Sequence, residues 1–75
     1  MSQKEAVEII RKAFADVEVV KIVVEYDSIV GGKVAKVFVR DDQLEAALVE
    51  NGVIPRRAAM ESGLDVEVVL ASGLP

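Results

Sequence analysis

The chain has 75 residues, a formal net charge of -4 and a pI of about 4.7. This length has room for one hydrophobic core, so residues 1–75 are expected to form a single domain. The chain contains no Cys and no His. Disulfides and thiolate metal sites are therefore excluded, together with the commonest metal ligand and the commonest general base. The hydrophobic content of 52% predicts a globular fold.

No apolar stretch approaches the roughly 20 residues that a transmembrane helix needs. The N-terminal stretch MSQKEAVEII is charged and lacks the apolar core of a signal peptide. We therefore expect a soluble, cytoplasmic chain with no membrane partner. The acidic balance argues against non-specific attraction to nucleic-acid phosphates, although an acidic domain can still carry a local basic patch.

The first predicted element is a helix that begins with a capping box, in which Ser2 caps the helix and Glu5 reaches back. Val7, Ile10 and Phe14 follow on one helical stripe, and the helix is expected to end at Asp16.

A hairpin of two strands is predicted next. From Val17 to Tyr26 apolar side chains alternate with polar ones. The pair Gly31-Gly32 marks the turn, and the return strand runs from about Lys33 to Arg40. The side chains expected to face the core are Val20, Ile22, Val24, Tyr26, Ala35, Val37 and Val39. Those expected to face water are Lys21, Glu25 and Lys36.

The second half of the chain predicts two short helices and a strand. Asp42 is expected to cap a helix that carries Leu44, Ala47 and Leu48. Gly52 is a plausible left-handed stop, and Pro55 suits the first position of a further helix that ends near Gly63. The last strand, 66–71, alternates again, with Val66, Val68 and Leu70 on the face opposite Glu67.

The predicted order is α-β-β-α-α-β, which is an α+β fold. Because two helices separate the second and third strands, those strands are expected to be parallel neighbours, while the first two form an antiparallel hairpin. The result is a three-stranded mixed sheet with all three helices on one face.

This order, with a Gly-bearing turn between the last two helices, resembles the type II KH domain. The stretch DDQLEAALVENGVIPRRAAMESGLDVEVV, residues 41–69, is similar to the second KH domain of NusA-type transcription elongation and antitermination factors. The upstream stretch AFADVEVVKIVVEYD resembles the segment that enters that domain. The resemblance implies single-stranded RNA binding, in which a G-x-x-G loop approaches the nucleic-acid backbone and a helix start offers free N–H groups.

The chain keeps only part of the family's loop. Val49 stands at the first Gly position, Glu50 and Asn51 fill the middle, and Gly52 keeps the second Gly. A branched side chain and a carboxylate would both oppose a phosphodiester, so RNA binding is expected to be weak or absent. The positions carried over from the family as nucleic-acid-binding residues are Asn51, Gly52, Arg56 and Arg57.

Each of these residues also has an ordinary structural explanation. Arg56 and Arg57 could occupy a solvated first turn, paired with Glu50 or Glu61, and Gly52 could be a helix C-cap. The Asp41-Asp42 pair is expected to be a helix cap rather than a metal site or an acid–base pair. No catalytic residue, metal site, cofactor or small-molecule substrate is predicted, and the chain is not expected to be an enzyme.

Two alternatives to RNA binding through a KH loop remain. A helix-turn-helix with Pro55 to Ser62 as recognition helix is disfavoured by its shortness, by Glu61 and by the flanking strands. The other alternative is an engineered or optimised KH-fold scaffold with no nucleic-acid or catalytic activity. Clean helix caps, regular alternation and heavy use of valine agree with that interpretation.

Overall fold

The computed structural model describes residues 2–73. The helices are α1 (Gln3–Ala13), α2 (Leu44–Ala47) and α3 (Val49–Ser62). The strands are β1 (Val19–Asp27), β2 (Gly32–Val39) and β3 (Asp65–Leu70), and short 3-10 turns occupy Asp41–Gln43 and Ala71–Gly73. The predicted α-β-β-α-α-β order and α+β class are confirmed.

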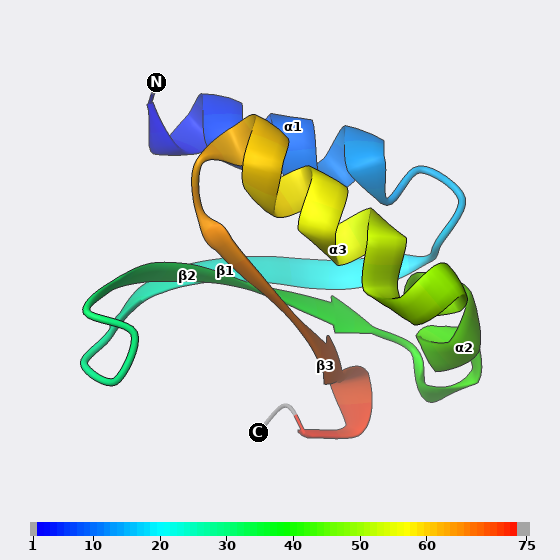
Figure 1. Cartoon of the computed structure of the whole chain (residues 1–75). Helices are drawn as coiled ribbons and strands as arrows, with labels where there is room; N and C mark the ends of the chain where they lie inside the picture. Colours follow the sequence, from blue (N-terminus) through cyan, green and yellow to red (C-terminus); the bar gives the residue numbers. More distant parts are fainter. Residues whose placement is uncertain (1, 74–75) are drawn as a thin grey trace.

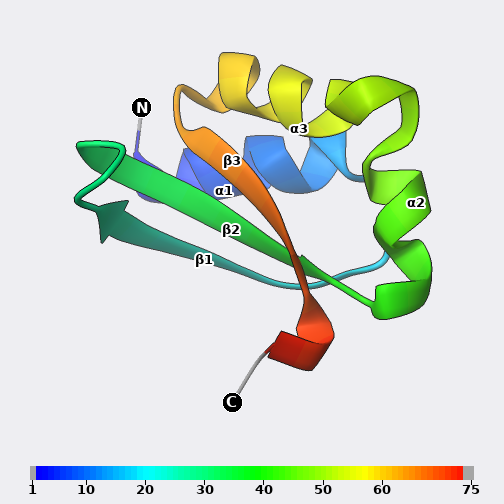
Figure 2. The same ribbon diagram turned by 60° about the horizontal axis from the view of Figure 1, so that its bottom comes forward.

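The three strands form one mixed sheet in the order β1-β2-β3. β1 pairs antiparallel with β2, and β2 pairs parallel with β3. The prediction that the second and third strands are parallel neighbours is therefore confirmed. Figures 1 and 2 show α1 and α3 side by side over one face of the sheet, with α2 at the end of that layer. Within residues 2–73, no helix combines the length and the apolar composition needed to cross a bilayer.

The capping box at the start of α1 is confirmed with one difference in its partners. The Glu5 amide N–H donates to Ser2 Oγ over 3.2 Å. The Glu5 carboxylate accepts a hydrogen bond from the Ser2 hydroxyl at 3.1 Å, where a capping box usually uses the backbone N–H. The helix ends at Ala13, earlier than the predicted Asp16, because Phe14 leaves the helical dihedrals as its C-cap and enters the core.

A β-bulge corrects the predicted phase at the start of β1. Val19 pairs with Val39 and Lys21 pairs with Phe38, which leaves Val20 without a partner residue on β2. Val20 is consequently 50% exposed, and Val19 packs against the core in its place. The alternation beyond the bulge follows the prediction, with Ile22 and Val24 packed against the core.

Tyr26 is also more exposed than the alternation predicted, at 69%. It pairs with Lys33 next to the hairpin turn. In Figure 1 this end of the hairpin extends beyond the helices, so no helix covers the inner face there. The turn itself is built by Asp27, whose carboxylate accepts hydrogen bonds from the N–H groups of Ile29 and Val30 at 2.8 and 3.2 Å. Gly31 supplies the left-handed residue, with φ of 80°.

The core lies between the inner face of the sheet and the helices. Its centre is β2, where Ala35, Val37 and Val39 are fully buried as predicted. Ile22 and Val68, on the two neighbouring strands, pack against this centre but are only partly buried, because each strand lies at an edge of the sheet. The helices contribute Ile10, Phe14, Ala47 and Ala58.

The predicted cap of the second helical segment is wrong. The chain enters that segment through the 3-10 turn Asp41–Gln43, and no side chain caps it. The Asp42 carboxylate instead contacts the Arg40 guanidinium at 2.8 Å, and the same guanidinium contacts Glu18 at 2.9 Å. Asp42 therefore takes part in a charge cluster that joins the start of α2 to the loop before β1.

The charged side chains expected on the outer face of the sheet lie there, next to the partly buried Val23 and Phe38. Lys21, Glu25 and Glu67 are exposed, and Lys36 lies between them at the centre of β2. The Lys36 Nζ lies 2.6 Å from a Glu25 carboxylate oxygen. This hydrogen bond and the charge of Glu25 raise the pKa of Lys36 above its ordinary value of 10.5, and Glu67 and Asp27 add to the effect.

The inner and outer faces of β1 can be compared with two neighbouring substitutions. We expect Ile22→Ala to lower the free energy of unfolding by about 2 kcal/mol, at the low end of the usual range because Ile22 is only partly buried. Val23→Ala, on the outer face, should lower it by less than about 1 kcal/mol. Urea unfolding measures both free energies. A larger loss of stability for Val23→Ala would show that the face of β1 assigned to solvent packs against the helices instead.

The Lys36–Glu25 contact predicts a pH dependence in the alkaline range. Because the pKa of Lys36 is raised on folding, the stabilisation is fully present below the ordinary lysine pKa and is lost as the pH rises through the raised value. In Glu25→Gln the pKa of Lys36 should fall toward its ordinary value, which an NMR titration of the Lys36 side chain measures. The stability difference between wild type and variant should shrink with rising alkaline pH; a constant difference would contradict this origin.

Candidate nucleic-acid interface

The corner between α2 and α3 is a short left-handed turn. Glu50, Asn51 and Gly52 have φ of 53°, 57° and 80° with ψ of 48°, 35° and 34°, so three successive residues lie in the left-handed helical region. The Gly52 N–H donates to the Leu48 carbonyl at 3.2 Å and closes the turn. Gly52 is therefore left-handed as predicted, but Glu50 and Asn51 share its conformation.

This turn holds non-glycine residues in a conformation that is strained for them. An L-residue in the left-handed region loses roughly 1–2 kcal/mol relative to the right-handed one, because Cβ approaches the following carbonyl oxygen. Asn tolerates the region better than most residues, and Gly has no such strain. Glu50 is thus the residue in the corner least suited to its backbone conformation.

Right-handed helical dihedrals resume after Gly52, so the straight part of α3 begins at Val53. Pro55 is then the third residue of that helix, whereas the sequence predicted it at the first position. It is still tolerated, because N–H groups in the first turn have no helical partner. Arg56 and Arg57 lie in the second turn, where the repulsion between a cation and the positive end of the helix has largely faded.

The two arginines point to different sides of α3. Arg56 precedes the fully buried Ala58 by two residues, or about 200° around the helix, and so faces solvent. Arg57 lines a hollow of about 430 Å³ together with Lys12 and Asp16 at the end of α1. The structure therefore separates the two cations and leaves Arg56 alone on the outward side of the helix.

The electrostatic partners of the corner are few. Within residues 2–73 the ion pairs involve Lys36 and Arg40, so Arg56 and Arg57 do not pair with Glu50 or Glu61. The Glu50 side chain is exposed on the corner itself. A positive and a negative charge thus lie within one short stretch of surface, and an approaching phosphate would meet both.

The carboxylates of Asp41 and Asp42 have different partners. Asp42 contacts Arg40, and Asp41 Oδ1 accepts a hydrogen bond from the Ser72 N–H at 3.4 Å. Throughout the part of the chain that the structure describes, no cluster of three or more carboxylate side chains could hold a metal ion. The expectation that this pair caps a helix is wrong, because neither carboxylate makes a cap hydrogen bond.

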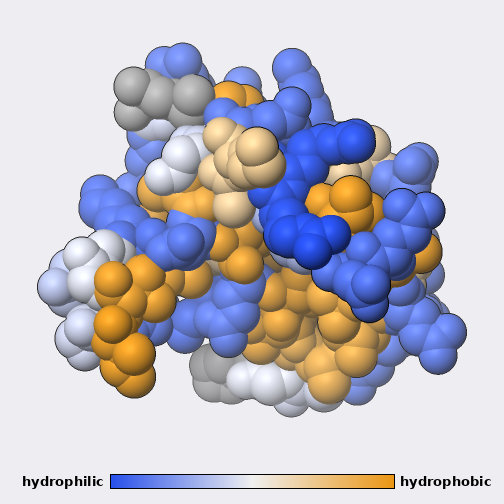
Figure 3. Space-filling model, viewed as in Figure 1, coloured by the Kyte–Doolittle hydropathy of each residue, from blue (hydrophilic) through white to orange (hydrophobic). Residues whose placement is uncertain are grey.

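The surface next to the corner is formed by α3 and β3. Figure 2 shows β3 at the front edge of the sheet below α3, with β2 as its strand neighbour. A strand at an edge leaves alternate N–H and C=O groups without strand partners. In Figure 3 a strongly hydrophilic area lies over the middle of α3, and an apolar area lies below it toward the end of β3. Leu48 and Val49 are about half exposed beside the corner.

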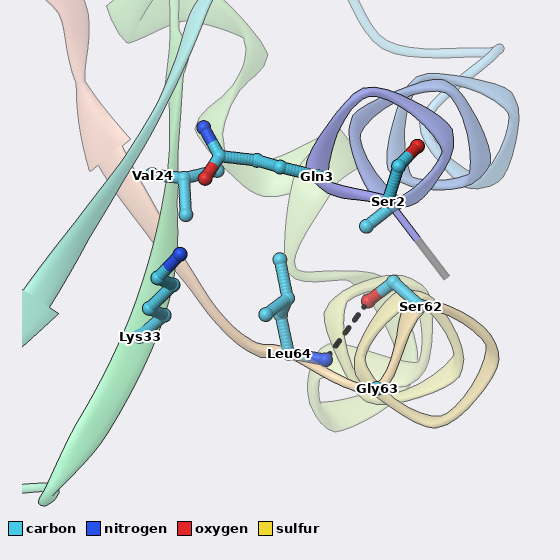
Figure 4. Close-up of a pocket in the computed structure, with 8 residues that line it drawn as sticks. Ser2, Gln3, Val24, Lys33, Ser62, Gly63 and Leu64 are labelled. Carbon is cyan, nitrogen blue, oxygen red and sulfur yellow. Dashed lines mark hydrogen bonds between the residues drawn. The ribbon is translucent and has the colours of Figure 1, made fainter.

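Another hollow lies at the other end of α3. A cavity of about 370 Å³ separates the start of α1 from the end of α3. Figure 4 shows the Gln3 and Lys33 side chains extending toward this space, beside Leu64, whose N–H donates to Ser62 Oγ at 3.3 Å. None of its lining residues belongs to the corner. This cavity is distinct from the interface that the sequence predicted.

Comparison with known proteins identifies no relative: no family model, no curated protein and no solved structure matches the chain.

The conformation of Glu50 predicts a gain in stability on substitution. Glu50→Gly should raise the free energy of unfolding by about 0.5–1 kcal/mol, because the relief of left-handed strain exceeds the extra chain entropy of Gly. Gly52→Ala should lower it by about 1–2 kcal/mol through backbone strain, since a Cβ there meets only the Pro55 Cγ at an ordinary 3.6 Å.

The matched control is Glu45→Gly, at an exposed position in the right-handed turn of α2. It should destabilise the protein by about 0.5–1 kcal/mol. Denaturant unfolding of the three variants gives the comparison. Equal effects of Gly at positions 45 and 50 would show that residue 50 is not left-handed in solution.

Proposed function

We propose that this protein is a KH-type module of a single-stranded RNA-binding family, similar to those of NusA-type transcription factors, whose own affinity for RNA is weak. The observation that carries the proposal is the corner. A tight turn ending in a left-handed Gly joins two helices, and the second helix lies beside the free edge of a sheet with the predicted α-β-β-α-α-β order.

The geometry of the corner supports contact with an extended backbone. Gly52 has no side chain, and an added Cβ would meet only Pro55 within 4 Å. A ligand can therefore approach the backbone closely at this point. The straight part of α3 follows directly, and the N–H groups at a helix start generally lack helical partners, although Pro55 contributes none. Arg56 adds an outward-facing cation one turn later. A phosphate placed at the corner would meet N–H donors and a guanidinium.

Two residues explain why the proposed affinity is weak. The exposed Glu50 carboxylate repels a phosphate at short range. Val49 is 48% exposed and places a branched side chain where the family has Gly. Arg57, turned toward the end of α1, contributes little to the same contact. The proposed role is RNA binding and not catalysis. We place this role in the cytoplasm.

A second candidate function is that of a scaffold with no nucleic-acid activity. The observation in its favour is that the hollows around α3 lie away from Val49–Gly52: one lies against α1, and one at the helix's far end. The hollow of about 500 Å³ beside the hairpin turn is likewise lined by other residues. In this second proposal the chain is an engineered or optimised KH-fold scaffold.

Restoring the family's loop tests the proposal. The double variant Val49→Gly, Glu50→Lys should bind a labelled single-stranded RNA more tightly than the unaltered chain, because it removes a branched side chain and exchanges a repulsive charge for an attractive one. Its affinity should fall as salt rises, since phosphate contacts release counterions, and should fall again with Arg56→Ala. A titration by fluorescence anisotropy at low and moderate salt measures all three.

Glu8→Lys is the matched control for net charge, because Glu8 is exposed on α1 and the charge change equals that of Glu50→Lys. It should leave RNA affinity close to that of the unaltered chain. An equal gain in Glu8→Lys would mean that only overall charge matters. A folded double variant with no salt-sensitive binding would favour the scaffold.

A further inference from the structure

The corner holds the chain's only asparagine, Asn51, directly before Gly52. The Asn51 side chain is exposed, so water and hydroxide reach its amide. An Asn followed by Gly is chemically labile, because no side chain on the second residue hinders attack of its backbone nitrogen on the asparagine amide. Both residues lie in the non-helical part of α3 near its start, where the chain turns away from α2.

We propose that Asn51 is a site of spontaneous deamidation whose rate is controlled by opening of the α2–α3 corner. The Gly52 backbone nitrogen, after losing its proton to hydroxide, attacks Asn51 Cγ. The new N–Cγ bond forms and the Cγ–Nδ2 bond breaks, while the departing nitrogen takes a proton from water and leaves as ammonia, which regenerates hydroxide. Water then opens the resulting five-membered imide at either carbonyl, which gives aspartate or isoaspartate.

The closed corner opposes the first step of this reaction. Ring closure requires the Gly52 nitrogen to lie on the same side of the Asn51 Cα–C bond as Cβ. With ψ of 35° at Asn51, tetrahedral geometry places that nitrogen nearly opposite Cβ. The Gly52 N–H also donates to the Leu48 carbonyl at 3.2 Å, so its proton is held. Deamidation therefore proceeds through a state in which this turn has opened.

The strain at Glu50 bears on how often the corner opens. A residue in an unfavourable conformation raises the free energy of the closed turn but not of the open one, and local opening is governed by that difference. Glu50, with φ of 53°, is such a residue beside Asn51. Relief of its strain should slow deamidation in the folded protein without changing the intrinsic chemistry of Asn51.

The product changes the corner in two ways. A carboxylate replaces a neutral amide next to Glu50, and isoaspartate adds one atom to the backbone within the left-handed turn. Where RNA binding is concerned, the inference rests on the proposed function: the modified form should bind RNA less tightly, because two adjacent carboxylates would face the phosphate.

Mass spectrometry tests the proposal without reference to RNA. The folded protein, the protein unfolded in urea, and a synthetic peptide of residues 41–56 are incubated in the same mildly alkaline buffer. Tryptic cleavage after Arg40 and Arg56 releases the peptide of residues 41–56 from both protein samples, and fragmentation distinguishes Asn51 from Gln43. We expect deamidation at Asn51 in all three, on the order of tenfold or more slower in the folded protein.

Two further substitutions separate opening of the turn from the chemistry of Asn51. Glu50→Gly should slow deamidation of the folded protein severalfold, and the same substitution in the peptide should leave the rate unchanged. Asn51→Gln should remove the modification. Equal rates in the folded protein and the peptide would overturn control by the corner, and an unmodified Asn51 in the unfolded protein would overturn the site itself. Failure of the RNA titration alone would leave both results standing and would count only against the proposed function.

Discussion

The left-handed turn at Glu50–Gly52 is the constraint on which the placement of the second half of the chain depends. The hydrogen bond from the Gly52 N–H to the Leu48 carbonyl closes it. Beyond it, α3 must run so that Ala58 and Ser62 are buried over the sheet. Only then can the chain turn at the left-handed Gly63 and lay β3 parallel to β2. A parallel neighbour requires a crossover connection, and this corner divides that connection into two helices.

The same turn concentrates the features that bear on the proposed function. It holds two non-glycine residues at positive φ, the exposed Glu50 carboxylate and the only Asn. Backbone strain that persists in a native structure is found mostly where the surroundings fix it, and such places are often functional. In this chain the backbone strain, the negative charge of Glu50 and the accessible backbone at Gly52 lie within three residues. Any RNA contact of the proposed kind, and the proposed deamidation, would both involve this turn.

Sequence patterns predicted the regular elements because each is fixed by local chemistry. The Ser2–Glu5 cap, the Gly-bearing hairpin turn and the alternation along β2 all specify their own conformation. The bulge at Val20 was not predictable from alternation, because Val19 and Val20 are both apolar and the pairing with β2 decides which one faces the core. Asp42 was predicted as a cap, but its ion pair with Arg40 competes successfully for the same carboxylate.

The sequence predicted a Gly-bearing turn between the last two helices but not the geometry of that turn. The resemblance placed Asn51, Gly52, Arg56 and Arg57 together, whereas the helix phase, set by where α3 straightens at Val53, turns Arg57 toward α1. The left-handed state of Glu50 has no local sequence signal, since glutamate does not favour it; only Asn51-Gly52 marked the turn.

The most direct test of the account is an NMR titration of the unaltered, isotope-labelled protein with single-stranded RNA at low salt. The account predicts small, fast-exchange shifts confined to the corner, the start of α3 and the β3 edge, which vanish at moderate salt. Shifts centred on the outer face of the sheet, or tight binding that survives moderate salt, would contradict it, and so would the absence of any shift at low salt.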